Sequence, residues 1–249
     1  MQIEPKKLFP PQQEVLKKGL LTGNRSCILH MATGSGKTFL SEFAIDHVLS
    51  EGYKVVYVTP LRALAEQQAT RWKNRFPQKE IGVFTGETIG TSSNRSRYSK
   101  SQILIMTPER LDAVLRHWRS HWDWIPDVNL VIIDEAHILG MGARGPRLEG
   151  ALTRLTRLNP FVRILGLSAT IPNACEIAAW LGGTAYTSFW RHIPLEKKIV
   201  RFSSAKDKPT LLLAAVKRCI DAGGQSLVFC NSRSRVQQIA DYLLASGLP

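Results

Sequence analysis

Hydrophobic residues in this chain follow two alternating patterns. Short runs that are apolar at nearly every position, such as residues 54–59 and 130–134, are typical of strands buried on both faces of a sheet. Between them lie longer segments with apolar residues at helical spacing, such as residues 61–76. This alternation predicts a doubly wound α/β fold, in which helices cover both faces of a parallel sheet.

The individual elements follow from the same pattern. The predicted strands are residues 27–29, 54–59, 81–84, 102–106, 130–134 and 163–168. The predicted helices are residues 12–20, 39–45, 61–76, a segment that begins at Pro108, and residues 148–158 and 174–181. The two prolines before Gln12 are expected to stop regular structure ahead of the first helix.

The pattern changes after Tyr186. A helix at 210–222, a strand at 225–230 and a helix at 232–246 begin a second α/β unit, which has too few strands to form a sheet. We therefore expect a first domain at residues 1–194, a linker at 195–209 and an incomplete second domain at 210–249. On this interpretation the chain is cut short.

Composition and charge narrow the class of protein. The 249 residues suffice for one large or two smaller domains, and no apolar run approaches the ~20 residues of a membrane helix. The four cysteines form no Cys-x-x-Cys pair, which argues against a disulfide scaffold or a zinc site. The net charge of +13 favours a polyanionic partner such as nucleic acid, with a membrane surface or simple solubility as alternatives.

A glycine-bearing stretch, Met-Ala-Thr-Gly-Ser-Gly-Lys-Thr at residues 31–38, joins the first predicted strand to a helix. Its glycines lack a Cβ, so the backbone can turn tightly and bring N–H groups close to phosphate oxygens. The lysine can reach the β- and γ-phosphates, and the final threonine hydroxyl can bind Mg²⁺. We interpret the stretch as a phosphate-binding loop rather than an ordinary glycine turn, although Met31 stands where the general pattern has glycine. The expected cofactor-binding residues are Thr33, Gly34, Ser35, Gly36, Lys37 and Thr38.

An acidic box, Asp-Glu-Ala-His, begins at Asp134 at the carboxyl end of a predicted strand. Parallel strands present functional groups at that end. Asp134 would hold Mg²⁺ through its water shell, and Glu135 would orient and deprotonate an attacking water. With Lys37, these residues form a candidate catalytic set for phosphoryl transfer. The alternative, an acidic turn at the end of a strand, is disfavoured by the phosphate-binding loop.

The loop and the acidic box together resemble those of superfamily 2 helicases of the DEAH type. Further motifs follow in the order of that family, and they cover nearly the whole chain. The segments at 9–12, 59–65, 84–86, 107–109, 168–170 and 227–232 resemble the Q, Ia, TG, Ib, III and IV motifs. Residues 144–149, 165–173 and 188–195 resemble the Ski-like branch. Within the last of these, residues 190–195 look most like the archaeal Hel-type DNA repair helicases of that branch. Methionine at the position of Met31 also occurs in that branch.

The resemblance implies a RecA-like domain of the P-loop NTPase class, followed by the start of a second RecA-like domain. It also implies roles for residues outside the loop and the box. Gln12 would hydrogen-bond adenine, unless it only starts a helix. His137, Ser168 and Thr170 would couple hydrolysis to domain motion, with an ordinary strand-end turn as the alternative for the last two. Contacts to the phosphates of one nucleic-acid strand would come from Arg62, Thr85, Gly86, Thr107 and Arg110, with solvated helix charges as the alternative for the two arginines.

The function implied is that of the N-terminal motor region of an ATP-dependent helicase in DNA repair or replication-fork processing. It would bind ATP, Mg²⁺ and single-stranded nucleic acid, with DNA favoured over RNA, as a monomer without membrane contact. The location would be cytoplasmic and nucleoid-associated, or nuclear in a eukaryote. The alternatives are an RNA helicase of the same branch, a translocase that does not unwind, and a binding module without turnover. Because the family's arginine finger would follow Pro249, we expect residues 1–249 to bind ATP but to hydrolyse it very slowly.

Three weaker signals complete the sequence. The basic segment at 94–100 is interpreted as a solvated loop rather than a phosphate contact. His117 and His121 are four residues apart, but no third ligand is evident, so we expect no metal there. Packing against the sheet, rather than stacking on bases, is expected for Trp118, Trp122 and Trp124.

Overall fold

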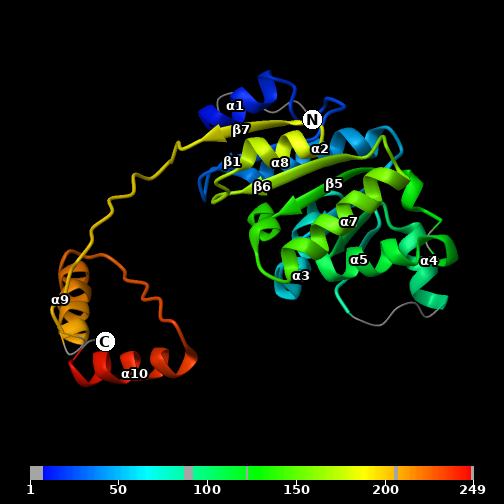
Figure 1. Ribbon diagram of the computed structural model, residues 1–249. Coiled ribbons are helices and arrows are strands. Elements are labelled where there is room, and N and C mark those ends of the chain that lie inside the picture. The colour runs from blue at the N-terminus through cyan, green and yellow to red at the C-terminus, as the bar shows by residue number, and fades with distance from the viewer. Residues whose placement is uncertain (1–7, 87–91, 122, 205–206, 248–249) are drawn as a thin grey trace. The chain divides into compact units, whose positions relative to one another are not determined.

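The computed structural model describes residues 8–86, 92–121, 123–204 and 207–247 (Figure 1). The chain divides into two compact units, Met1–Pro194 and Leu195–Pro249. The first unit contains a seven-stranded sheet in the order β3-β4-β2-β5-β6-β1-β7, and every described strand pair is parallel. This confirms the predicted doubly wound parallel sheet. No described helix is long and apolar enough to cross a bilayer.

The elements of the first unit alternate along the chain as predicted. The strands are β1 (Cys27–Met31), β2 (Lys54–Val58), β3 (Ile81–Phe84), β4 (Ile103–Met106), β5 (Val128–Asp134), β6 (Arg163–Ser168) and β7 (Thr184–Ser188). The α-helices are α1 (Pro10–Lys17), α2 (Lys37–Ser50), α3 (Arg62–Arg75), α4 (Ser92–Lys100), α5 (Pro108–Arg116), α6 (Trp118–His121), α7 (Arg144–Leu158) and α8 (Ala174–Trp180). Two 3₁₀ helices, η2 (Ile125–Asp127) and η3 (Ala136–Gly140), flank β5.

The central strands are buried on both faces because their side chains alternate between two apolar layers. In β5, Val131 and Ile133 join the core beneath α5, α7, η3 and α8. Leu130 and Ile132 join the core beneath α1, α2 and α3. The period of two along a strand therefore explains why these runs are apolar at successive positions. It also fixes which side chains of neighbouring strands share a face.

The edge strand β7 was not predicted. It pairs in parallel with β1, with Tyr186 opposite Leu29, and only Tyr186 of its five residues is buried. The segment Thr-Ala-Tyr-Thr-Ser is polar because an edge strand lies against the core along one side only. The apolar run that marks a central strand is therefore absent.

Two helices begin earlier than predicted because proline lies in their first turn. Helix α1 starts at Pro10 and not at Gln12, with Pro10 and Pro11 as its first residues. Helix α7 starts at Arg144, four residues before the predicted position, and includes Pro146. A proline at the start of a helix loses no hydrogen bond, since the first N–H groups have no intrahelical partner. The expectation that Pro10 and Pro11 stop regular structure ahead of the first helix is therefore wrong, since both lie within α1.

The segment at 94–100 lies within helix α4, so its interpretation as a solvated loop is wrong. Tyr98 is buried and stacks on Phe84, with ring centroids 3.3 Å apart. Trp124 is also buried and lies parallel to Tyr98 at 5.9 Å, and Trp118 packs partly against the same core. Packing is thus confirmed for these two tryptophans, whereas Trp122 lies outside the described residues. One buried aromatic among polar residues carries too weak a periodic signal to predict a helix.

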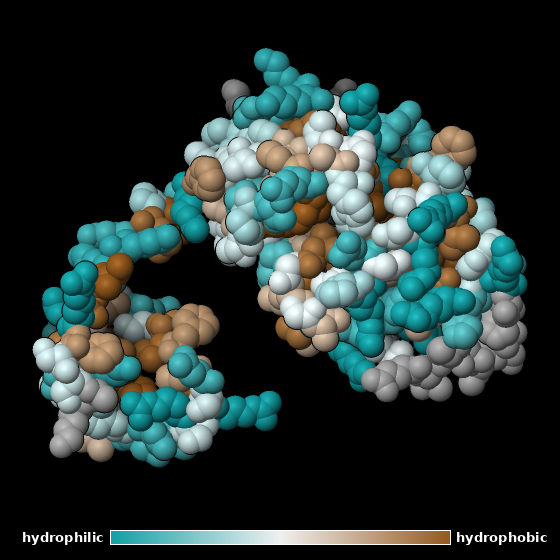
Figure 2. Space-filling view, viewed as in Figure 1, coloured by the Kyte–Doolittle hydropathy of each residue, from teal (hydrophilic) through white to brown (hydrophobic). Residues whose placement is uncertain are grey.

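The second unit contains two helices, α9 (Asp207–Asp221) and α10 (Arg233–Ala245). Helix α9 begins three residues before its predicted start, because Asp207 accepts a hydrogen bond from the Ser204 N–H at 3.0 Å and fixes the first turn. The predicted strand at 225–230 is not formed in the described residues, since no described segment pairs with it. Phe229 is 87% exposed there, and Figure 2 shows hydrophobic side chains at the surface of this unit.

Candidate functional site

Three neighbouring strands bring the predicted catalytic residues to one edge of the sheet. Strands β5, β6 and β1 are adjacent, and their carboxyl ends are Asp134, Ser168 and Met31. Asp134 is in register with Leu167, and Ser168 with His30. The acidic box, the Ser168 segment and the glycine-bearing loop therefore leave the sheet side by side.

The loop after β1 has the backbone that phosphate binding requires. Gly34 and Gly36 adopt φ angles of 78° and 82°, which lie in the left-handed region that other residues rarely enter. Met31 stays in β1 without positive φ, so glycine is not needed at that position. Helix α2 then begins at Lys37 and directs its free N–H groups toward the loop.

Lys37 extends its ammonium group along the inside of this loop. Its Nζ donates hydrogen bonds to the carbonyl oxygens of Met31 at 2.9 Å and Ala32 at 3.1 Å. Burial lowers the pKa of Lys37, while the nearby Glu135 and Asp134 carboxylates act in the opposite direction. The ammonium group thus lies close to the acidic box, as the candidate catalytic set requires.

Gln12 is buried against the loop. Its Nε2 donates to the Ser35 carbonyl oxygen at 3.0 Å, and its Oε1 accepts from the Phe9 N–H at 2.9 Å. The φ of 82° favours glycine at position 36, and a Cβ there would lie 2.1 Å from the Gln12 Nε2, so a larger residue would displace the Gln12 amide. Each amide atom of Gln12 keeps one further donor or acceptor position, which matches the paired donor and acceptor on an adenine edge.

An aromatic cluster beside Gln12 joins the two ends of the first unit. The ring of Phe9 lies 4.9 Å from that of Trp190 and 5.0 Å from that of His192. Arg191, between them in sequence, acts with burial to lower the pKa of Lys37, so its charge is near the loop. Sequence reasoning assigned no role to Arg191 or His192. Their position after an unpredicted edge strand explains the omission.

The acidic box has a strained turn. Glu135 has φ 55° and ψ 51°, and it is the one non-glycine residue with positive φ in the described parts of the chain. The turn lets the Glu135 N–H donate to the Asp134 Oδ1 at 3.1 Å, and it starts η3. His137 follows, with its Nδ1 3.2 Å from the Glu135 Oε2. Strain of this kind is concentrated at functional sites.

Tyr57 of β2 also contacts the acidic box, and sequence reasoning missed it. Its hydroxyl donates to the Asp134 Oδ2 at 2.7 Å. Burial raises the pKa of Tyr57 well above its ordinary value, and Asp134 adds to this, so the phenol remains a donor at neutral pH. In the sequence Tyr57 is one apolar residue in a buried strand. Only the alignment of β2 with β5 shows its role.

The residues present fit a nucleotide and a magnesium ion. The Ser35 hydroxyl is buried and has no hydrogen-bond partner among the described residues, in a loop whose N–H groups suit an anion. No group of three or more His, Cys, Asp or Glu side chains suited to a metal occurs in the described residues. Magnesium needs no such group, since it is usually held by one or two carboxylates together with phosphate oxygens and waters. Asp134 and Thr38 offer oxygen ligands of that kind.

The predicted coupling residues lie at the end of β6. Ser168 is fully buried, and its Oγ accepts from the Thr170 N–H at 3.2 Å. Thr170 itself is exposed. The hydrogen bond shapes the turn between β6 and α8, and the roles of both residues stay predictions.

A separate groove of about 470 Å³ also lies at the carboxyl ends of the strands, near β3, β4 and the N-terminus of α3. All five residues predicted to contact nucleic-acid phosphates line it, although they are up to 48 positions apart in sequence. These residues are Arg62, Thr85, Gly86, Thr107 and Arg110. The Thr107 hydroxyl also caps α5, accepting from the Arg110 N–H at 3.4 Å.

The two predicted arginines of the groove differ in exposure. Arg62 is exposed, but Arg110 is only 4% exposed, and its Nε donates to the Tyr98 hydroxyl at 2.7 Å. The alternative of a solvated helix charge is therefore wrong for Arg110. Tyr98 has a pKa raised to about 12, mainly by burial, so it keeps its proton and remains a neutral partner for the guanidinium group.

Two further arginines of the groove come from α7, and sequence reasoning gave them no role. Arg144 donates to the Glu109 Oε1 at 2.7 Å and to the Pro60 carbonyl oxygen at 2.8 Å. Arg147 lines the groove one helical turn further on. The signal that could have found them is their place in the Arg-Gly-Pro-Arg segment shortly after the acidic box, in a helix that begins earlier than predicted.

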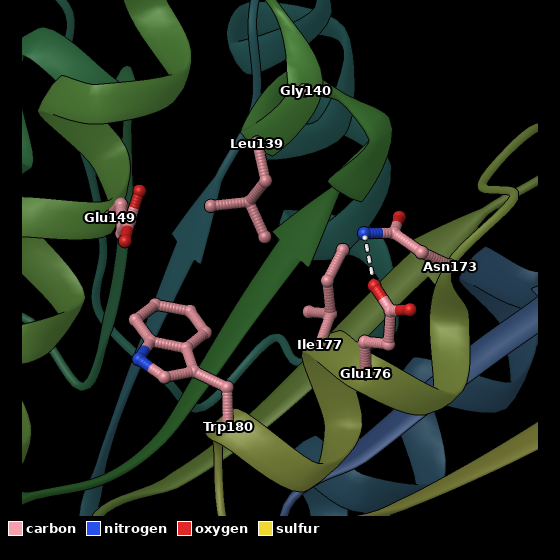
Figure 3. A pocket seen from close by; sticks show the side chains of 7 residues that line it. All are labelled: Leu139, Gly140, Glu149, Asn173, Glu176, Ile177 and Trp180. Atoms are coloured by element: carbon pink, nitrogen blue, oxygen red, sulfur yellow. Dashed lines mark hydrogen bonds between the residues drawn. The ribbon is translucent and has the colours of Figure 1, made fainter.

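A second hollow, of about 280 Å³, lies between η3, α7 and α8 (Figure 3). Figure 3 shows Leu139, Ile177 and the indole of Trp180 around it. Asn173 donates to the Glu176 Oε2 there at 3.3 Å. None of the predicted site residues lines this hollow, so it is separate from the site described above.

The parallel sheet, the phosphate-binding loop and the acidic box at its edge define a nucleoside triphosphate-binding domain. The family model of the DEAD/DEAH box helicase matches residues 9–177, and the chain belongs to that family. This confirms the resemblance stated from the motifs.

Individual relatives agree. The chain is 37% identical over 244 residues to the ATP-dependent DNA helicase Hel308 of Pyrobaculum calidifontis, covering 94% of this chain and 34% of that protein. It is 34% identical to the Hel308 of Methanococcus vannielii, covering 91% of this chain and 32% of the relative. The chain thus spans about a third of the length of these relatives. A solved structure of the DUF1998 helicase MrfA shares the fold with a TM-score of 0.73 at 19% identity, covering 98% of this chain and 42% of MrfA.

Proposed function

We propose that this chain is the N-terminal motor region of an ATP-dependent DNA helicase that binds ATP, Mg²⁺ and single-stranded DNA. One observation carries the proposal: the phosphate-binding loop, the acidic box and an arginine-lined groove lie along the same edge of one sheet. The loop suits a nucleotide, and the groove suits a chain of phosphates.

In the nucleotide half of the site, Lys37 faces the β- and γ-phosphates, and Gln12 contacts the adenine. Thr38 and Asp134 hold Mg²⁺, which when bound neutralises charge on the phosphates. Glu135 orients the attacking water and accepts its proton. His137, Ser168 and Thr170 link this site to the movement of the second unit. In support, Lys37 is close to both carboxylates, and His137 lies 3.2 Å from Glu135.

In the nucleic-acid half, the phosphates of one strand are contacted by Arg62, Thr85, Gly86, Thr107 and Arg110. Arg144 and Arg147 extend this set from α7, and Arg110 supports the groove wall through Tyr98. Contacts to phosphate carry no sequence information, so binding is tolerant of sequence. The net charge of +13 favours such a partner.

DNA is proposed over RNA because the similar relatives are named ATP-dependent DNA helicases. We propose DNA repair or replication-fork processing as the context, with the protein acting as a monomer on DNA in the nucleoid or the nucleus. We also propose that residues 1–194 form the ATP-binding domain, 195–209 a linker and 210–249 the start of a second RecA-like domain. The division of the chain after Pro194 supports the first boundary.

Calorimetric titration with ATP and Mg²⁺ tests the nucleotide half. Lys37→Ala should weaken binding about tenfold to a hundredfold, because a hydrogen bond to a charged group contributes roughly 1.5–3 kcal/mol. The exposed Lys73, changed to alanine, serves as the control of equal charge and should leave the affinity unchanged. Equal affinity in Lys37→Ala and the parent would contradict the proposal.

Competition between DNA and RNA oligonucleotides of one sequence tests the nucleic-acid half. Single-stranded DNA should bind at least as tightly as RNA, and Arg62→Ala should weaken both. A clear preference for RNA would favour the RNA helicase alternative. Binding that Arg62→Ala leaves unchanged would overturn the assignment of the groove.

A further inference from the structure

Tyr57 and Asp134 lie on neighbouring strands and on the same face of the sheet. In the β2–β5 pair Tyr57 is in register with Ile132, and Asp134 is two residues further along β5. A step of two returns a side chain to the same face, so Asp134 extends toward the layer that holds Tyr57. Because a tyrosine is long and leans along its strand, its hydroxyl can reach the end of the next strand.

The contact gives each oxygen of the Asp134 carboxylate one donor from the protein. The Tyr57 hydroxyl donates to Oδ2 at 2.7 Å, and the Glu135 N–H donates to Oδ1 at 3.1 Å. A carboxylate oxygen accepts two hydrogen bonds, so with one donor each from the described residues both oxygens keep a lone pair for a further partner. The two donors together fix the plane of the carboxylate.

Tyr57 is itself rigidly held. It is 1% exposed, and its ring meets that of Trp72 edge to face at 4.8 Å. The Trp72 indole donates to the Glu42 Oε1 at 3.3 Å, and Arg71 lies 2.6 Å from the same oxygen. Glu42 is one turn beyond Thr38 on α2. The chain of contacts therefore runs from Asp134 to the helix that carries the other proposed oxygen ligand.

We propose that Tyr57 is a positioning residue for a divalent cation: its hydroxyl holds Asp134 in the orientation that receives Mg²⁺ with the nucleotide. The inference rests on the proposed function, because it takes Asp134 as the magnesium-binding carboxylate. Partners of metal-binding carboxylates fix the geometry of the ligand, and their loss typically lowers metal affinity about 10- to 100-fold.

Tyr57→Phe removes only the hydroxyl and keeps the ring against Trp72. The measurement is the affinity for ATP by calorimetry, once in EDTA and once with Mg²⁺, with Mn²⁺ binding followed by electron paramagnetic resonance as a second readout. In Tyr57→Phe the ATP affinity in EDTA should stay within about twofold of that of the parent. The factor by which Mg²⁺ increases the ATP affinity should fall about tenfold. Tyr53→Phe, an exposed tyrosine just before the same strand, should behave as the parent does.

Two outcomes would overturn this inference but leave the proposed function unaffected. One is an unchanged gain from Mg²⁺ in Tyr57→Phe. The other is an equal loss in EDTA and in Mg²⁺, which indicates a general effect on packing. A parent whose ATP affinity does not respond to Mg²⁺ would instead overturn the proposed function as well.

If Tyr57→Phe does not fold, 3-fluorotyrosine in place of Tyr57 keeps the hydroxyl and provides a ¹⁹F signal. That signal should shift when Mg²⁺ is added to the protein already bound to ATP. No shift under saturating Mg²⁺ would overturn the inference.

Discussion

The side chain of Gln12 is hydrogen-bonded to the phosphate-binding loop. Its Nε2 donates to the carbonyl oxygen of Ser35, which is 23 residues away in the sequence, at 3.0 Å. Its Oε1 at the same time accepts from the Phe9 N–H and caps the start of α1. Gln12 therefore orders the loop as well as offering an amide to a base. The two effects can be separated by changing the base.

Gln12→Ala should weaken the binding of both ATP and GTP. The loss of the bond to Ser35 loosens the loop for either nucleotide, and ATP also loses the contact to adenine. We expect about a tenfold loss of affinity for ATP, which loses two hydrogen bonds of roughly 1 kcal/mol each, and a smaller loss for GTP, which loses one. Calorimetry with both nucleotides measures this. An unchanged affinity for GTP would show that Gln12 acts on adenine alone.

Binding of single-stranded DNA should weaken steeply with salt, because phosphate contacts release counterions. Each contact contributes about 0.7 to the slope of log affinity against log salt. Arg62→Ala should lower that slope by about this amount, whereas Arg157→Ala, an exposed arginine of α7 outside the groove, should not. Fluorescence anisotropy at several salt concentrations gives both slopes. Equal slopes for the two variants would contradict the role of Arg62.

Tyr98→Phe should destabilise the first unit by about 1.5–3 kcal/mol, since a buried guanidinium group loses an acceptor. The affected contact is the 2.7 Å hydrogen bond from the Arg110 Nε to the Tyr98 hydroxyl. Urea unfolding of the variant and the parent measures the difference in free energy. Tyr53→Phe, where the tyrosine is exposed, should leave the stability unchanged and controls for the loss of a hydroxyl.

The ion pair between Glu109 and Arg144 should make stability depend on acid pH. Burial acts to raise the pKa of Glu109, but hydrogen bonds from Arg144 and other donors outweigh it and hold the pKa below the ordinary 4.5. A carboxylate with a depressed pKa stabilises the fold above pH 4.5, and this contribution is lost as the pH falls through its value in the folded protein.

Glu109→Gln should therefore be less stable than the parent at pH 7, by about 1 kcal/mol or less for a partly exposed pair. The difference should shrink as the pH falls below 4.5. Urea titrations across this range measure it, with Glu149→Gln, an exposed carboxylate of α7, as the control. A difference that does not change with pH would show that the charge of Glu109 is not its cause.

Much of the fold and of the site could be predicted from local sequence. Gly34, Gly36 and Lys37 carry their chemistry within eight residues, and the buried strands are marked by continuous apolar runs. The edge strand β7 could not be found in this way, because only Tyr186 of its five residues is buried and the strand therefore has no continuous apolar run. Helix α4 was missed for a similar reason, since its burial depends on Tyr98.

Residues that act through tertiary contacts were beyond local patterns. Tyr57 differs from its apolar neighbours in β2 only by a hydroxyl, and the contact with Asp134 depends on the pairing of β2 with β5. Arg144 reaches Glu109 and Pro60 from a helix whose start was placed too late. In each case the missing information is which strand or helix lies alongside, and not the residue type.

Glu135 holds a left-handed backbone conformation that glycine or asparagine would adopt with less strain, and such strain costs roughly 1–3 kcal/mol. Selection for stability alone would therefore not keep a glutamate there. At this residue the amino acid that folds best and the amino acid that can serve as the proposed base are different. A screen that ranks variants of this chain by heat resistance should therefore enrich those in which Glu135 is replaced. The most heat-stable variants would then lack the proposed catalytic base.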